Sequence, residues 1–482
     1  MRNCENTEQL QRNRGYHVSK REDYKRFIVF CLASLVVLAQ AAVFAWVWYS
    51  VYRGQIDEPF WRKGNWVLIA IYGLMFALFA KLYGGLKVGY LKRIDVFYSL
   101  TLALLCTNVV EYLEITLINR WFLSVWPMIE MTGIQLVLII IWIFGSRYIY
   151  SGLYRARRLL VIYGDRDPGD DLIHKMNSRK DKYDISGKVT WMVERKIHQM
   201  MQDYDGVIIW DLHSTERNRY LKYCFAHSVR CYVSPKISDI ILMGSERIHL
   251  FDTPLLVSRN MGLAVDQRAA KRVMDILISG IGIIITSPIM LIIAIAVKAY
   301  DRGPVFYFQD RLTLGGKPFK ICKFRSMCVD SEKNGARLAS KHDSRITPVG
   351  HVLRNLHLDE LPQLFNVFKG DMSLVGPRPE RESIMLEYEK ELPEFYYRLK
   401  VKAGLTGYAQ VYGKYNTTPY DKLKLDLFYI ENYSFLLDIK LIFMTVKIFF
   451  QKEVSEGVDD RQVNALKDSG KNAGVSENKT EE

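Results

Sequence analysis

The sequence lacks the cysteine patterns of a zinc site or of a disulfide-rich secreted protein. It has seven cysteines, but no two of them form a Cys-x-x-Cys pair, and no histidine stands at a spacing that suits zinc. Two of the cysteines, Cys31 and Cys106, lie within long apolar runs. We therefore expect reduced thiols with a structural role, and a soluble part that faces the cytoplasm.

The two ends of the chain lack further features. Residues 1–26 are polar and basic and have no cleavable signal pattern, so we expect a cytoplasmic N-terminus. Residues 453–482 are charged and contain no aromatic side chain, which predicts a disordered tail.

The whole chain has a formal net charge of +14 and is 49% hydrophobic. Such a basic excess is typical of proteins that bind nucleic acid or an anionic membrane surface. The long apolar runs favour the membrane, and we expect no binding to nucleic acid.

Long apolar segments fill residues 27–145. There are four of them, and each approaches the roughly 20 residues that a helix needs to cross a bilayer. The segments span residues 27–49, 66–83, 96–118 and 122–144. Lysine and arginine cluster after the second and the fourth segment, and fewer of them occur in the first and third connections. By the positive-inside rule, this predicts four transmembrane helices with both ends in the cytoplasm.

Acidic side chains interrupt the third and fourth of these segments. They are Glu111, Glu114 and Glu130. Acids within a membrane are often functional. A place near the lipid headgroups is the simpler interpretation, and we expect it here.

Residues 158–262 have the pattern of an α/β domain. Apolar runs that end in turns predict strands, and they alternate with helical stretches, which is typical of a parallel, Rossmann-like sheet. The runs are RLLVIYG, YDGVIIWDL, VRCYVSP and PLLVSRN. The first run lacks the G-x-G-x-x-G of a dinucleotide site, since Gly164 is followed by an acidic loop with Asp165 and Asp167. We therefore predict a scaffold or regulatory domain that binds no nucleotide.

A fifth apolar run, Val273–Val297, has basic residues at both ends and Ser287-Pro288 just past its middle. A full crossing would place the rest of the chain outside the cytoplasm, whereas basic residues on both flanks favour a return to the same side. We therefore predict a re-entrant membrane helix over residues 266–298 that bends at Ser287 and Pro288. The Ser287 hydroxyl would bond a backbone group left unpaired at the bend. A simple kinked span is the alternative.

The stretch from His351 to Glu380, HVLRNLHLDELPQLFNVFKGDMSLVGPRPE, contains the most distinctive chemistry. Two acids, Asp359 and Glu360, are adjacent, and Pro362 follows them. Because proline is tolerated only in the first turn of a helix, a break precedes it and a new helix runs over residues 362–368. At a helix start two neighbouring carboxylates can share one site, and the backbone N–H groups there favour an anion.

Arg378 follows in a stiff loop, between Pro377 and Pro379. An acid that can attack or bind a metal, a partner acid and a fixed guanidinium together suit phosphoryl transfer. From this stretch in isolation, an N-capping aspartate with a surface arginine is the alternative.

These motifs together resemble the bacterial sugar transferases, and most closely the large monotopic phosphoglycosyl transferases, which are polyprenyl-phosphate hexose-1-phosphate transferases. The resemblance covers essentially the whole chain. The motifs that carry it are KRVMDILIS, GPVFYFQDR, FKICKFRSM, RITPVGHVLR, LDELPQL, KGDMSLVGPRP, GLTGYAQVYGK and LDLFYIENYSFLLDIKLI. It implies a catalytic domain over residues 299–451 that is mixed and mainly helical, with interfacial helices.

The resemblance also implies a reaction. A UDP-sugar gives its sugar 1-phosphate to undecaprenyl (polyprenyl) phosphate, and UMP is released. Asp359 would be the nucleophile of an aspartyl-phosphosugar intermediate, and Glu360 would hold Mg²⁺ together with Asp359. Arg378 is the leading candidate to clamp a phosphate, because guanidinium can bind two oxygens at once.

Further candidates are weaker. Lys323, Arg325 and Arg354 could bind phosphate, and lipid headgroups or a structural carboxylate are equal alternatives for them. Asp310 and Arg311 would help to organise the site. Ser373 and Thr406 could bond substrate oxygens, with capping and turn roles as alternatives. Three glycines, Gly404, Gly407 and Gly413, indicate a backbone that comes close to another group, such as the nucleotide, or plain turns.

The expected location is the bacterial inner membrane, as a multi-pass protein with its active site on the cytoplasmic face. The product would begin repeat units of exopolysaccharide, capsule or O-antigen, so downstream glycosyltransferases are expected partners. A homodimer is left open.

Two other functions compete with this hypothesis. A membrane-bound, NAD-dependent nucleotide-sugar dehydratase or epimerase would share the layout, but it needs the glycine fingerprint that is missing after Ile162. Its Tyr-x-x-x-Lys pattern occurs twice, at Tyr396/Lys400 and Tyr420/Lys424, and discriminates little. A non-catalytic scaffold of a polysaccharide assembly complex has no need for an arginine loop beside an acidic pair.

Overall fold

The computed structural model of the chain divides into two units between Ser234 and Pro235. It describes residues 24–56, 62–164, 172–177, 179–192, 194–258, 262–328, 345–413 and 417–448. Most of the expected basic N-terminus and the whole expected disordered tail lie outside these ranges.

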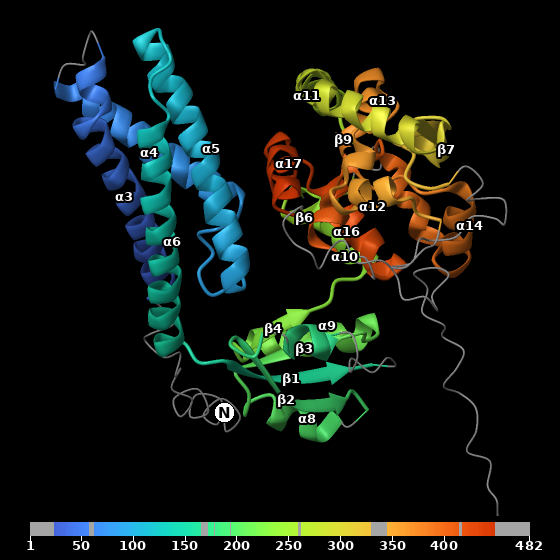
Figure 1. The fold of residues 1–482 in the computed structure, drawn as a ribbon. Helices are drawn as coiled ribbons and strands as arrows, with labels where there is room; N and C mark the ends of the chain where they lie inside the picture. Colours follow the sequence, from blue (N-terminus) through green and yellow to red (C-terminus); the bar gives the residue numbers. More distant parts are fainter. Residues whose placement is uncertain are drawn as a thin grey trace, which may run out of the picture. The chain divides into compact units, whose positions relative to one another are not determined.

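The first unit begins with a bundle of long helices (Figure 1). They are α3 (Lys25–Ser50), α4 (Arg62–Leu82), α5 (Arg93–Asn119) and α6 (Trp126–Leu153), with the short η1 (Tyr52–Gln55) after α3. Helices α3 and α5 each pack against both α4 and α6, which closes the bundle. Each of the four helices, and α11 of the second unit, is long and apolar enough to cross a membrane. The chain therefore has the character of a membrane protein.

The three acids of these helices differ in burial. Glu130 is exposed and Glu114 is partly buried, but Glu111 is fully buried inside the bundle. Glu111 is buried because of its position on α5, where it continues the inward face formed by Thr107 and Asn108. Burial between the helices is a finding about packing, and the expected place of the three acids near the headgroups stays a prediction.

A parallel sheet with strand order β2-β1-β3-β4 completes the first unit. Its strands are β1 (Arg157–Tyr163), β2 (Tyr183–Thr190), β3 (Gly206–Trp210) and β4 (Arg230–Val233), and its helices are α7 (His174–Asn177), α8 (Glu194–Met200) and α9 (Ser214–Ala226). Residues 159–162 of β1 are buried on both faces, which explains their continuous apolar run. The predicted α/β class is confirmed for these strands.

The structure changes the expected sheet at its C-terminal end. The run PLLVSRN forms a strand, β6 (Thr253–Val257), but it pairs with β5 (Glu246–Leu250) in a separate hairpin of the second unit. The sheet therefore ends at β4, well before residue 262. Close packing explains the glycine at position 164, because a Cβ there would lie 2.1 Å from the carbonyl oxygen of Asp211. Asp165 and Asp167 lie outside the described residues.

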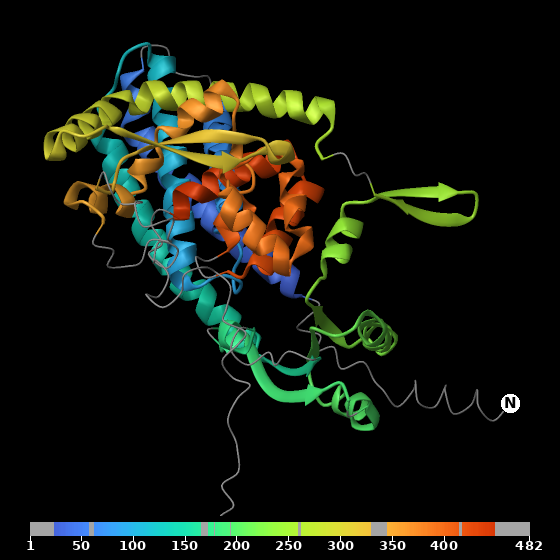
Figure 2. The ribbon, with the colours of Figure 1, turned by 90° about the vertical axis from the view of Figure 1, so that its right-hand side faces the viewer.

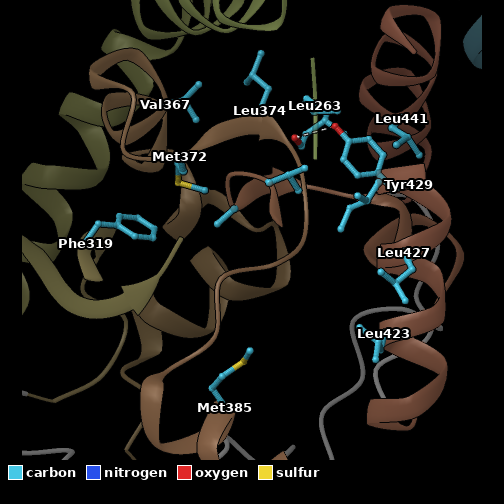
Figure 3. Close-up of a cluster of buried hydrophobic side chains, with 14 of the residues drawn as sticks. Leu263, Phe319, Val367, Met372, Leu374, Met385, Leu423, Leu427, Tyr429 and Leu441 are labelled. Carbon is cyan, nitrogen blue, oxygen red and sulfur yellow. Dashed lines mark hydrogen bonds between the residues drawn. The ribbon is translucent and has the colours of Figure 1, made fainter. Parts of the chain in front are cut away.

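The second unit is mainly helical around small sheets. Its helices are α10 (Ile237–Met243), α11 (Val265–Asp301), η3 (Leu314–Gly316), α12 (Pro348–Asn355), η4 (Leu358–Glu360), α13 (Gln363–Lys369), α14 (Glu382–Glu391), η5 (Pro393–Lys400), α15 (Tyr408–Tyr412), α16 (Pro419–Glu431) and α17 (Phe435–Ile448). Besides the β5–β6 hairpin, β7 (Phe306–Leu312) pairs antiparallel with β8 (Pro318–Phe324), and β9 (Ser373–Val375) pairs parallel with β10 (Gly404–Thr406). Figure 3 shows the core between them, where Leu423, Leu427 and Tyr429 of α16 face Met372 and Leu374.

Helix α11 is one helix of 37 residues that continues through Pro288, and Figure 2 shows that it changes direction along its length. Pro288 has no N–H for the carbonyl of Ile284, four residues earlier. The Ser287 hydroxyl donates to that carbonyl at 2.8 Å, as the sequence predicted. The re-entrant course itself stays a prediction.

The re-entrant prediction can be tested with a cysteine at an exposed position near the end of α11. Tyr300→Cys, in a chain otherwise free of cysteine, should react with a membrane-impermeant maleimide only after the cytoplasmic side is opened, because both ends of the helix would lie on that side. Gly54→Cys, in the first connection, serves as the control and should react in intact cells. Labelling of the residue 300 cysteine in intact cells would show a full crossing instead.

Candidate active site

The two neighbouring acids lie in a tight turn between α12 and α13. His357 ends α12 in the left-handed conformation, with φ of 54°, and η4 follows at once with Asp359 and Glu360. The helix predicted over residues 362–368 is confirmed within one residue at each end, as α13. The N-cap of α13 is Pro362 and not an acid, so Asp359 precedes the helix and does not cap it.

Glu360 forms the central contact of the site. Its Oε1 accepts a hydrogen bond from Lys323 Nζ at 2.7 Å and from Arg378 Nη2 at 2.9 Å. Burial by itself would raise the pKa of Glu360, but Arg378 and Lys323 lower this pKa far below its usual range. Glu360 is therefore a carboxylate at any physiological pH, fixed in place by two cations.

Asp359 has the opposite environment. Its side chain is buried, and no described residue forms a hydrogen bond or ion pair with its carboxylate. Burial raises the pKa of Asp359, and the Glu360 charge adds to this, whereas Lys323 and Arg354 oppose it from a distance. The turn thus holds one acid that is fully paired and one whose oxygens are free to bind or attack another group.

Lys323 reaches the site because α13 holds its strand. Asn366 of α13 accepts a hydrogen bond from the Cys322 N–H at 2.9 Å and donates to the Lys320 carbonyl at 2.8 Å. These bonds fix the free edge of β8 at the position of Lys323. The sequence analysis did not single out Asn366, and its only signal was an amide among the apolar residues of a short helix.

The loop that carries Arg378 packs against the loop after β10. The Gly404 N–H donates to the Pro377 carbonyl at 2.9 Å. A Cβ on Gly404 or Gly407 would lie 2.0 Å from a backbone atom of Gly376. The close approach expected at Gly404 and Gly407 is therefore to this loop, and the third glycine, Gly413, lies against the carbonyl of Ala409.

A buried ion network supports the same loop from behind. Glu380 lies within ion-pair distance of Arg398 (3.5 Å), Arg311 (3.8 Å) and Lys422. Burial would raise the pKa of Glu380, but Lys422 and Arg398 lower it to about 2. Arg398 also donates to the Arg378 carbonyl at 3.0 Å, so the network fixes the backbone of the clamp. Of the four charged residues of this network, the sequence predicted a role only for Arg311.

The remaining candidates lie with other partners. The buried Arg325 forms an ion pair with the exposed Asp301 at the end of α11, and Arg354 donates to the Ser326 hydroxyl at 2.9 Å. Asp310 is exposed on β7, in register with Lys320 of β8. The Thr406 hydroxyl pairs with that of Thr445 at 2.6 Å. None of these four joins Glu360, although the charge of Arg354 acts on Asp359.

Helix α11 forms hydrogen bonds with the two segments that carry the site. Ser373 donates its hydroxyl to Asp275 Oδ1 at 3.0 Å, and the Leu374 N–H donates to the same oxygen at 2.9 Å. Arg272 lies one turn before Asp275 on α11 and donates to the carbonyls of Val367 and Phe368 at 2.8 and 2.7 Å. The strand that leads to Arg378 and the helix that follows Asp359 are thus bonded to one helix. The Ser373 hydroxyl thus has a structural partner, and its contact with a substrate oxygen stays a prediction.

The donor set can be compared with the needs of Mg²⁺. Among the described residues no three metal-binding side chains meet in one group. Mg²⁺ commonly uses one or two carboxylates and completes its shell with substrate phosphates and water. Asp359 and Glu360 supply oxygen donors of this kind, and Asp359 lacks a partner among the described residues. The two acids therefore fit the ion.

Comparison with known proteins gives a consistent picture. A family model described as bacterial sugar transferase matches residues 266–452. The UDP-N-acetylgalactosamine-undecaprenyl-phosphate N-acetylgalactosaminephosphotransferase of Aeromonas hydrophila is 39% identical over 251 residues, which are 51% of this chain and 58% of the relative. The UDP-glucose:undecaprenyl-phosphate glucose-1-phosphate transferase of Klebsiella pneumoniae is 43% identical over 208 residues, 42% of this chain and 43% of the relative.

A relative with the latter name in Caulobacter vibrioides is 37% identical over 229 residues, which are 45% of this chain and 84% of the relative. The matches to the Aeromonas and Klebsiella proteins span about half the length of those relatives. The family model covers the region in which the two acids, Lys323 and Arg378 meet.

Asp275 is expected to hold the Arg378 loop, and this can be measured as stability. Asp275→Ala removes the acceptor of two buried hydrogen bonds, worth about 1.5–3 kcal/mol each when the acceptor is charged. It should lower the unfolding temperature of the purified protein by at least about 4–8 °C. Asp275→Asn keeps an acceptor oxygen and should lose less than half of that. Equal losses in both variants would mean that the charge of Asp275, and not its hydrogen bonds, stabilises the strand.

Proposed function

The chain belongs to the bacterial sugar transferase family, and on that premise we propose that it moves a hexose 1-phosphate from a UDP-sugar to undecaprenyl phosphate and releases UMP. The observation that carries the proposal is the pair of acids in η4. Glu360 is paired with two cations, and its neighbour Asp359 is buried without a partner among the described residues. An acid of the second kind is suited to attack phosphorus.

We propose a covalent route. An oxygen of the Asp359 carboxylate attacks the phosphorus that bears the sugar, and the phosphoanhydride bond to UMP breaks, so that UMP leaves with the bonding electrons. An oxygen of undecaprenyl phosphate then attacks the same phosphorus, and the Asp359 carboxylate is set free. One phosphoanhydride replaces another, so the overall exchange needs little driving force.

Positive charge near Asp359 has to offset the repulsion between a carboxylate and a diphosphate. Arg378 is half-exposed and uses one of its nitrogens on Glu360, so its other N–H groups can bind phosphate oxygens. Lys323, which donates to the same Glu360 oxygen as Arg378, contributes further positive charge. Asp359 and Glu360 would hold Mg²⁺, which neutralises charge on the diphosphate when bound.

The finer assignments belong to the same proposal. The names of the relatives state two different sugars, N-acetylgalactosamine and glucose. We therefore propose the hexose class and leave its identity to a panel of UDP-sugars. The proposed location is the inner membrane with the site on the cytoplasmic face, where UDP-sugars are made. The lipid-linked product would start an exopolysaccharide, capsule or O-antigen repeat unit, which downstream glycosyltransferases extend.

The first test removes the proposed nucleophile. Asp359→Asn keeps the shape of the side chain but not its charge, and it should reduce UMP release from a UDP-sugar with undecaprenyl phosphate by at least about 1000-fold. Asp359→Glu should also fail, since one added methylene displaces the attacking oxygen from its in-line position. A labelled sugar 1-phosphate should remain on the wild-type protein when the lipid is withheld.

Glu391→Gln, an exposed change on α14, is the matched control and should keep wild-type turnover. All variants should show the same unfolding temperature and membrane fraction as the wild type. Normal UMP release by Asp359→Asn would rule out the covalent route, while NAD binding without UMP release would favour the dehydratase alternative.

The acid side of the pH profile provides a second test. Burial raises the pKa of Asp359, and Lys323 counteracts that rise. The nucleophile must be ionised, so activity should fall as the pH drops through this pKa. Lys323→Met removes a stabilising charge from the ionised form, and the acid limb of kcat/KM should move to higher pH. Lys320→Met, an exposed change on the same strand, should leave the limb in place. A shift to lower pH would contradict the assignment.

A further inference from the structure

Polar side chains connect all four helices of the bundle in the first unit. Gln40 of α3 and Gln135 of α6 donate to each other's backbone carbonyl, at 3.3 and 3.2 Å. Gln135 also donates to the Tyr72 hydroxyl of α4 at 2.7 Å, and Tyr72 donates to Asn108 Oδ1 of α5 at 2.8 Å. Asn108 closes the ring by donating to Gln135 Oε1 at 3.0 Å. We call these four residues the bundle network.

The bundle network and its neighbour Glu111 contain more buried acceptors than donors. The side-chain N–H and O–H groups of Tyr72, Asn108 and Gln135 all donate hydrogen bonds within the bundle, including one from Asn108 to Thr132. Two acceptor groups have no hydrogen-bond partner among the described residues: the amide oxygen of Gln40 and both carboxylate oxygens of Glu111. A group that brings a proton or a positive charge would satisfy them.

No described side chain brings that charge. Among the described buried residues of α3, α4, α5 and α6, Glu111 has the only carboxyl group, and none has a basic side chain. The titratable groups that act on it are Tyr72 on α4 and Glu114 on its own helix, and both are acids. The inward faces of α3 and α6 contribute amides, a serine and apolar groups. An unpaired carboxylate in such surroundings is strongly destabilising.

Water at the end of α5 does not supply the missing partner of the Glu111 carboxylate. Glu111 lies eight residues before Asn119, the last residue of α5, which places it about 12 Å from the end of the helix. The helix has 27 residues and a length of about 40 Å, and Glu111 lies about two turns inside its C-terminal end. Its side chain is fully buried between the helices. Acids in this position in membrane bundles commonly serve ion or proton binding.

We propose that Glu111, together with the bundle network, is a binding site for a monovalent cation, either a proton or an alkali-metal ion. The carboxylate supplies the charge, and carboxylate and amide oxygens are the donors that hard cations prefer. Tyr72, whose hydroxyl lies close enough to feel the charge of Glu111, connects the carboxylate to the bundle network, which also contains the unpartnered amide oxygen of Gln40. The inference does not depend on the transfer reaction proposed above, since all of its residues lie in the first unit.

Thermal unfolding of the full-length protein in lipid nanodiscs tests the alkali-metal ion. At about pH 8, exchange of choline chloride for sodium or potassium chloride at constant ionic strength should raise the unfolding temperature by about 2–4 °C, because the ligand binds only the folded bundle. Glu111→Gln keeps the shape but loses the charge, and it should abolish the rise. Glu114→Gln, one turn along α5, is the matched control and should keep it.

Reaction of the wild-type protein with dicyclohexylcarbodiimide tests the proton and needs no variant. This apolar reagent modifies protonated carboxyls, so labelling of Glu111, located by mass spectrometry, should increase as the pH falls from about 9 to 6. Protection by sodium or potassium would identify the alkali-metal ion as the occupant, and labelling that depends on pH alone would identify the proton. Absence of labelling at every pH together with no effect of sodium or potassium on unfolding would overturn the proposal.

Discussion

The contact of Glu360 with Lys323 and Arg378 is the interaction on which the arrangement of the candidate site depends. Each partner comes from a different segment: the acid from η4, the lysine from β8 and the arginine from the loop after β9. Burying one carboxylate with two cations is favourable only if all three side chains stay in place, because the loss of either cation would leave charge without compensation. The supporting structure accordingly fixes backbone more than side chains. Asn366 fixes the strand of Lys323, and Arg398 fixes the carbonyl of Arg378.

Helix α11 supplies the frame for these contacts. Arg272 holds the carbonyls at the end of α13, and Asp275 holds the start of β9. A third link starts at Lys271, which forms a buried ion pair with Asp438 at 2.6 Å and also bonds Tyr429. Tyr429 donates in turn to the carbonyl of Val375, the last residue of β9. One apolar helix therefore determines where the acid turn and the arginine loop lie relative to each other.

Local patterns in the sequence predicted local structure well. Pro362 marked the start of α13, alternating strands and helices indicated the parallel sheet, and Ser287 was expected to satisfy the carbonyl that Pro288 leaves free. These features depend on residues within one or two turns of each other, so their physics is visible in the sequence.

Partners that are distant in the sequence could not be predicted in the same way. Charge attraction has no sequence spacing, and any of the 66 lysines and arginines could pair with any acid. For this reason Arg325, expected at the phosphate site, lies with Asp301, and Ser373 lies with Asp275. The glycines of GLTG show the same limit. A close approach was predicted, but the Gly376 backbone that makes it necessary lies at least 28 residues away in the chain.

Two buried glutamates show how compensation of charge determines what an acid can do. Glu360 has two cations on one oxygen, so its charge is used for positioning, and it holds the loop of Arg378 next to Asp359. Glu111 is buried as completely as any residue of the bundle, and its oxygens have no partner among the described residues. The described residues give Glu111 no compensation of the kind that Lys323 and Arg378 give to Glu360. An acid whose charge the fold has compensated is held in one position, whereas one that the fold leaves unpaired retains its full affinity for a cation.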